Sequence, residues 1–115
     1  MYLAYDKLLD KEIALKILNF NLNITKSQLI TKEIEALSQL RHRNIVKLLD
    51  YFPLPKKQQF CVVMEFLRGG ELDDLWKEQP KRRFSERKAY SLFKQLLNAI
   101  DYCHTAKIIH RDMKY

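Results

Sequence analysis

The chain has 115 residues, of which 21 are basic and 14 acidic, so its formal net charge is +7. Hydrophobic residues make up 47% of the sequence, which fits one globular domain or a part of one and excludes a disordered chain. Only two residues are glycine, and Gly69 and Gly70 are adjacent. The sequence therefore contains no complete G-x-G-x-x-G loop and no P-loop.

The two cysteines, Cys61 and Cys103, lie far apart, and neither belongs to a C-x-x-C pair. This spacing argues against a disulfide framework or a zinc site, so we expect free thiols in a reducing compartment. No apolar run is long enough to span a bilayer, and residues 1–9 lack the pattern of a signal peptide. The sequence predicts a soluble protein of the cytoplasm, or of the nucleus, without a membrane partner.

Strands and one helix are predicted in the first half of the chain. Residues 2–5 read as the end of a strand, and residues 12–18 alternate with a period of two, which indicates a second strand. A helix capped by Thr25 or Ser27 is predicted to run to about residue 40. Two further strands are predicted over residues 45–52 and 59–66, with a turn at residues 53–57.

Helices are predicted to dominate the second half. The adjacent glycines precede a short helix over residues 71–79, and residues 80–83 form a basic loop. Ser85 is the predicted cap of a long helix, whose apolar stripe consists of Ala89, Phe93, Leu96, Ile100 and Cys103. A short apolar, strand-like step follows at Ile108 and Ile109.

Glu33 and Lys16 are charged residues at positions where the pattern predicts a buried surface. Lys16 shares a strand face with Ala14 and Leu18, and Glu33 has only apolar neighbours at helical spacing. Because an unpaired carboxylate on a buried face costs several kcal/mol, one interpretation is a buried ion pair between them. Two alternatives stay open: Lys16 reaches water from an edge strand, or the apolar stripe of the helix ends early. The apolar neighbours of Glu33 are Leu29, Ile30, Ala36, Leu37 and Leu40.

The polar tail of residues 110–115 follows the apolar step at residues 108–109. It places His110, Arg111, Asp112 and Lys114 within five positions. A carboxylate with a cation two residues further on suits a loop in which Asp112 accepts a proton. The alternative is an ordinary polar loop.

Taken together, these patterns resemble the eukaryotic protein kinase family over the whole chain. Residues 13–16 are similar to the V-A-I-K motif of the family's third strand, and Glu33 falls on the ion-pairing Glu of its C helix. Residues 40–46 resemble the L-x-H-P-N-I-V segment, with Arg43 in place of the proline. Residues 63–66 resemble the hinge, residues 69–72 the linker after it, and residues 110–115 the start of H-R-D-L-K-P-x-N.

The resemblance implies that seven residues form the nucleotide site, either by contact or by holding a contacting residue. Lys16 is expected to hold the α- and β-phosphates of ATP, and Glu33 to fix Lys16. Met64 is expected at the back of the adenine pocket, with Ala14 over the adenine ring. The remaining implied contacts are the backbone of Glu65 and Leu67 to adenine, and Glu71 near the ribose or a basic substrate residue.

The resemblance also implies how phosphoryl transfer is carried out. Asp112 is expected to orient and deprotonate the substrate hydroxyl, and Lys16 and Lys114 to balance charge on the phosphates. Lys114 stands two residues after Asp112, as in serine/threonine kinases. Residues 32–49 and 63–72 look most like the calcium/calmodulin-dependent and AMP-activated kinases, and the autophagy-initiating kinases are close too.

The implied fold is α+β and protein-kinase-like. Residues 1–66 correspond to a partial antiparallel N-lobe sheet with the C helix, and residues 67–115 to the hinge linker and the first C-lobe helices. The expected cofactors are ATP and Mg²⁺. The metal ligands and the glycine-rich loop match no residue of these 115, so we expect the chain alone to have no kinase activity.

The sequence is also compatible with a function other than catalysis and with other partners. A catalytically inactive, kinase-like scaffold shares every motif and is the alternative function, and self-association through the apolar face of the long helix is a further expectation. Residues 77–88 hold six basic and two acidic residues, a local charge of +4. Aromatic residues do not interleave with these basic residues, so we do not expect a nucleic-acid partner.

Overall fold

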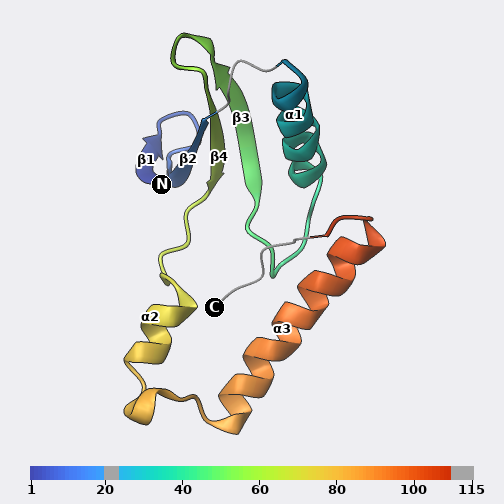
Figure 1. The fold of residues 1–115 in the computed structure, drawn as a ribbon. Helices are drawn as coiled ribbons and strands as arrows, with labels where there is room; N and C mark the ends of the chain where they lie inside the picture. The colour runs from blue at the N-terminus through green and yellow to red at the C-terminus, as the bar shows by residue number, and fades with distance from the viewer. Residues whose placement is uncertain (20–23, 110–115) are drawn as a thin grey trace. The chain divides into compact units, whose positions relative to one another are not determined.

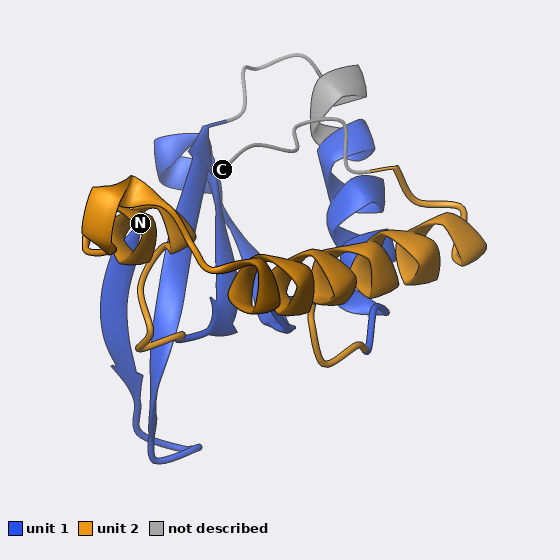
Figure 2. Ribbon diagram, turned by 90° about the horizontal axis from the view of Figure 1, so that it is seen from below, with its two compact units in different colours: residues 1–41, 45–66 blue, residues 42–44, 67–115 orange. Residues whose placement is uncertain are grey.

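The computed structural model describes residues 1–19 and 24–109, with side chains from residue 28 onward in the first helix. The chain divides into two compact units, shown in different colours in Figure 2. Unit 1 consists of Met1–Arg41 and Ile45–Phe66, and unit 2 of His42–Asn44 and Leu67–Tyr115. Unit 2 thus includes the short segment 42–44, and the expected division into an N-lobe part and a C-lobe part stays a prediction.

Unit 1 is an antiparallel sheet with one helix, as Figure 1 shows. Its strands are β1 (Tyr2–Asp6), β2 (Lys11–Asn19), β3 (Leu48–Leu54) and β4 (Gln59–Glu65), in the spatial order β1-β2-β4-β3. The helix is α1 (Ile24–Ser38), and the short 3-10 turn η1 (Pro55–Lys57) links β3 to β4. This architecture confirms the predicted α+β class and the antiparallel sheet.

The turn predicted at Pro53 begins later than expected. Pro53 lies inside β3, where it pairs with Phe60 of β4. Proline cannot donate a backbone hydrogen bond, and it is tolerated here because β3 is an edge strand of the sheet. The chain turns only at Pro55, and Gln58 closes the turn by donating its N–H to the carbonyl of Pro55 at 3.1 Å.

The core of unit 1 lies between α1 and one face of the sheet. Ile34 of α1 packs with Leu48, Phe60 and Val62 from β3 and β4, and all four are buried. Half-buried apolar residues complete the cluster, namely Leu18, Ile30, Tyr51 and Met64. Burial of this apolar surface is the main stabilising contribution available to a sheet carrying a single helix.

Unit 2 is helical. It contains α2 (Leu72–Lys77), the 3-10 turn η2 (Pro80–Arg82) and the long helix α3 (Glu86–Thr105). The predicted cap of α3 is confirmed, because Ser85 Oγ accepts a hydrogen bond from the Lys88 N–H at 3.3 Å. Along α3 the side chains of Phe93, Leu96 and Leu97 are exposed, and Ala99 is buried.

The segment 42–44 joins α3 through two contacts within unit 2. The rings of His42 and Tyr102 lie 5.0 Å apart between centroids, and Asn44 Nδ2 donates to Gln95 Oε1 at 3.0 Å. Arg43 lies between His42 and Asn44, at the position where the L-x-H-P-N-I-V segment has proline, and it is exposed.

The strand-like step predicted at Ile108 and Ile109 is wrong. The Ile108 N–H donates to the Cys103 carbonyl at 2.8 Å, and the Lys107 N–H donates to the His104 carbonyl at 2.9 Å. Lys107 has a left-handed φ of 59°. These bonds close the C-terminal end of α3 in a Schellman motif, so residue 108 satisfies a helix carbonyl and forms no strand. No helix within residues 1–19 and 24–109 has the length and hydropathy to cross a membrane.

Candidate functional site

Strands β2 and β4 place the predicted phosphate and adenine residues on one face of the sheet. Ala14 is paired with Met64, and Lys16 is paired with Val62. Directly opposed residues of an antiparallel pair point to the same face. Val62 and Met64 belong to the core cluster beneath α1, so Lys16 stands on the sheet face that α1 covers. The predicted shared face of Ala14, Lys16 and Leu18 is confirmed.

The residues that share this sheet face with Lys16 are apolar, whereas Lys16 itself is exposed. Ala14 is only 7% exposed, and its partner Met64 is half-buried. Leu3 of β1 lies opposite Ala14 on the other side of β2 and adds a further apolar residue to this face. Leu3 could not be assigned to this face from the sequence, because the position of a single leucine is uninformative until the strand register is known.

The buried ion pair predicted between Lys16 and Glu33 is wrong for this structure. Both residues are exposed, and neither has an ion pair with another described residue. The buried residue of α1 is Ile34, which is 3% exposed. The helix therefore presents Ile34 to the sheet and turns Glu33 to water, which avoids desolvating a carboxylate. Neither alternative left open holds as stated, because β2 lies between β1 and β4 and is not an edge strand, and buried residues continue after position 33 at Ile34 and Leu40.

The orientation of α1 is supported by a polar contact on its neighbouring strand. Tyr51 Oη of β3 donates to Glu35 Oε1 at 3.3 Å. Burial, followed by the nearby Glu35 carboxylate, raises the pKa of the Tyr51 hydroxyl above its ordinary value. Glu35, which has polar neighbours along the helix, thus faces the edge strand, while Ile34 faces the core.

Glu65, the last residue of β4, is held by the chain segment before β3. Its Oε1 accepts a hydrogen bond from the Lys47 N–H at 2.7 Å, and its own N–H donates to the Lys47 carbonyl at 3.0 Å. The Glu65 N–H is thereby committed to Lys47. Sequence reasoning missed Lys47, because its contribution comes from backbone atoms and carries no side-chain signal.

The predicted residues of unit 2 lie in the segment before α2. Leu67 is 54% exposed, and its N–H donates to no described residue. Glu71 is the N-cap residue of α2, but its side chain makes no capping hydrogen bond. Its carboxylate is exposed and available to a hydroxyl or a cation. The two predicted transfer residues, Asp112 and Lys114, lie outside the described residues.

Metal ligands are not gathered in the part of the chain that the structure describes. Within it, no three His, Cys, Asp or Glu side chains approach one another closely enough to hold a metal ion. The structure therefore assigns no magnesium ligand among the described residues, and we assign no step to the metal. The described residues do fit the nucleotide that the resemblance implies. Ala14 is buried, Met64 is half-buried and Lys16 is exposed, and all three share one face of the sheet.

Comparison with known proteins identifies the family. The protein kinase domain model matches residues 1–115, and the chain belongs to that family. It is 36% identical over 114 residues to CBL-interacting serine/threonine-protein kinase 21 of Arabidopsis thaliana, covering 97% of this chain and 26% of that protein. It is 38% identical over 115 residues to the carbon catabolite-derepressing protein kinase of Saccharomyces cerevisiae, covering 97% and 17%.

A further relative is serine/threonine-protein kinase Aurora-2 of Arabidopsis thaliana, which is 38% identical over 118 residues, covering 99% of this chain and 40% of that protein. The chain thus spans less than half the length of these three relatives. The predicted membership of the protein kinase family is confirmed, and the finer resemblance to one kinase group stays a prediction.

Proposed function

We propose that this kinase domain sequence serves ATP-dependent phosphoryl transfer to the Ser or Thr hydroxyl of a protein substrate. The observation that carries the proposal is the shared sheet face of Ala14, Lys16 and Met64 in a chain that matches the family throughout. The serine/threonine preference is supported by Lys114, two residues after Asp112, and by the serine/threonine kinases among the relatives.

The chemistry assigns one task to each group. The Lys16 ammonium offsets negative charge on the nucleotide phosphates, and the Asp112 carboxylate accepts the proton of the attacking hydroxyl. A bond then forms between that oxygen and the γ-phosphorus as the bond to the β-phosphate oxygen breaks, with ADP as the leaving group. Lys114 stabilises the charge on the group in transfer.

Nucleotide binding is the first test, and a pair of lysines provides a matched comparison. Lys16 and Lys47 are both exposed lysines of unit 1, and Lys47 contributes only backbone atoms to the contacts described. We expect ATP to bind the chain, Lys16→Met to weaken binding about tenfold, and Lys47→Met to change it by less than about twofold. Calorimetric titration with ATP measures both. No heat and no ATP-induced thermal shift would contradict the proposal and favour the non-catalytic scaffold.

Catalysis is a separate test. We infer that the 115-residue polypeptide alone transfers no phosphoryl group, because no residue that it contains matches the metal ligands or the glycine-rich loop of the family. The assay uses radiolabelled ATP with a generic basic protein substrate. Turnover that disappears in Asp112→Asn would show that this inference is wrong.

A further inference from the structure

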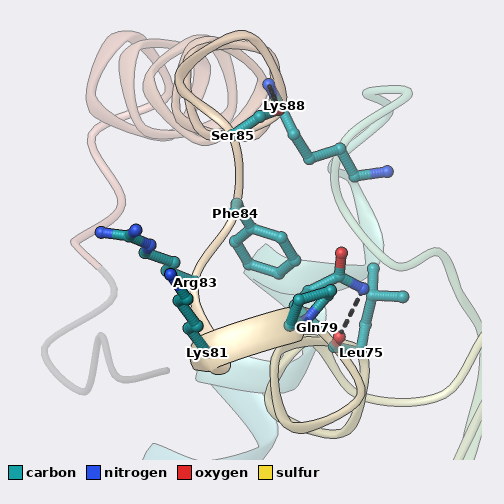
Figure 3. A pocket seen from close by; sticks show the side chains of 8 residues that line it. Leu75, Gln79, Lys81, Arg83, Phe84, Ser85 and Lys88 are labelled. Atoms are coloured by element: carbon teal, nitrogen blue, oxygen red, sulfur yellow. Dashed lines mark hydrogen bonds between the residues drawn. The ribbon is translucent and has the colours of Figure 1, made fainter.

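Unit 2 contains a cavity between α2 and the start of α3, and none of its residues has been assigned to ATP or to phosphoryl transfer. Its volume is about 560 Å³, which lies within the usual range of ligand-binding cavities. Figure 3 shows the side chains that line it. They are Leu75, Gln79, Pro80, Lys81, Arg83, Phe84, Ser85 and Lys88.

The floor of the cavity is apolar and held in place by hydrogen bonds. In Figure 3 the Phe84 ring points toward Gln79 and Leu75, and all three residues are half-buried. Gln79 Nε2 donates to the Leu75 carbonyl at 3.0 Å, and the Arg82 N–H donates to the Gln79 carbonyl at 3.0 Å. These bonds fix the turn that carries Phe84, so the apolar surface has a defined shape before any ligand arrives.

The rim of the cavity is cationic. Lys81, Arg83 and Lys88 are exposed, none of the lining residues is acidic, and none of these three cations forms an ion pair within the described residues. Figure 3 shows Lys81 and Arg83 on one side of Phe84 and Lys88 on the other. A carboxylate placed over the ring therefore has cationic side chains on two sides.

The N-terminal end of α3 adds to the positive electrostatic potential at the rim. Ser85 Oγ occupies the Lys88 N–H, but other N–H groups of the first turn have no partner inside the helix. The positive end of α3, a helix of 20 residues, lies at the same rim, because Ser85 and Lys88 both line the cavity. Its contribution is secondary to that of the three side chains, because the helix field acts only within the first turn.

We propose that this cavity binds an acidic peptide segment in which one apolar side chain is flanked by carboxylates. The apolar side chain occupies the surface of Phe84 and Leu75, and the carboxylates contact Arg83 and Lys88. Single exposed ion pairs contribute little, so affinity requires several carboxylates acting together with apolar burial. The cavity therefore fits a peptide better than an isolated inorganic anion.

A nucleic acid fits the cavity less well. Sequence-independent binding of single strands uses a basic groove along which successive bases stack on aromatic rings. Phe84 is the one aromatic residue that lines this cavity, and its ring points toward Gln79 and Leu75.

The test measures fluorescence anisotropy of a labelled ten-residue peptide composed of Asp and Glu around a central phenylalanine. The test variant is Arg83→Glu with Lys88→Glu. The matched control is Lys56→Glu with Lys57→Glu, which makes the same change in charge at exposed residues of η1 in unit 1. We expect the cavity variant to weaken binding about tenfold and the control to weaken it by less than about twofold.

Three further arms complete the design. Circular dichroism checks that each variant is folded, and Arg83→Gln with Lys88→Gln replaces the test variant if charge reversal unfolds it. A peptide with serine in place of the central phenylalanine is expected to bind at least about fivefold more weakly. Equal losses in both charge variants, equal affinity for the serine peptide, or absence of binding would overturn the proposal. A single-stranded RNA that competes more strongly and depends on the same two cations would also overturn it.

Discussion

The substitution Ile34→Ala tests the orientation of α1, which decides whether Ile34 or Glu33 faces the sheet. Ile34 is 3% exposed and packs against Leu48, Phe60 and Val62. The change removes three buried carbon groups at about 0.8 kcal/mol each and leaves a cavity, so we expect a loss of about 3 kcal/mol of unfolding free energy. For a chain of this size such a loss lowers the melting temperature by roughly 10–20 °C.

Two neighbours on the same helix provide the controls. Leu29 is 61% exposed and Glu33 is exposed, so alanine at either position is expected to cost less than about 1 kcal/mol. Urea unfolding followed by circular dichroism measures all three variants, and an unchanged slope with a shifted midpoint identifies a change in stability.

A loss of stability from Glu33→Ala as large as that from Ile34→Ala would contradict this orientation of α1, because the carboxylate would then stand on the packed face that the sequence pattern first indicated. Where Ile34→Ala is too unstable to purify, Ile34→Val replaces it. Loss of a single methylene group is expected to cost about 1 kcal/mol, still more than the glutamate variant.

Two further predictions concern the cap of α3 and the buried thiol. Ser85→Ala removes the acceptor of the Lys88 N–H, so thermal unfolding should show a loss of about 1 kcal/mol, and full retention of stability in Ser85→Ala would contradict the capping role. Burial raises the pKa of the Cys61 thiol above its ordinary value of 9.0. The contribution of this thiol to the free energy of unfolding is therefore present below pH 9.0 and is lost as the pH rises through the folded-state pKa. At pH 8, iodoacetamide should therefore modify the partly exposed Cys103 well before Cys61, with both reacting equally in urea, and equal rates in the folded protein would disprove this order.

The strands could be predicted from the sequence because their signal is local. The alternation over residues 12–18 correctly gives the shared face of Ala14, Lys16 and Leu18, which the pairing with β4 confirms. The cap at Ser85 is likewise encoded in a single residue type before an apolar-periodic segment.

The sequence predictions were wrong where a segment could adopt two local structures and its tertiary contacts decide between them. Pro53 looks like a turn residue until β3 is known to be an edge strand. Ile108 looks like part of a strand, but its N–H satisfies a carbonyl of α3. The face of α1 that is buried depends on which residues the sheet offers, and Leu48, Phe60 and Val62 select Ile34. The backbone contact of Lys47 with Glu65 has no counterpart in side-chain pattern at all.

In the nucleotide complex that we propose, the exposure of Lys16 and Glu33 limits how these two residues can come together. Rotating α1 to bury Glu33 would withdraw Ile34 from the core, at a cost close to that of the alanine variant, and would desolvate a carboxylate as well. An exposed ion pair returns at most about 1 kcal/mol, which does not offset that cost. Pairing of Lys16 with Glu33 is therefore expected to use the reach of the two long side chains at the surface, with Ile34 remaining in place against the sheet.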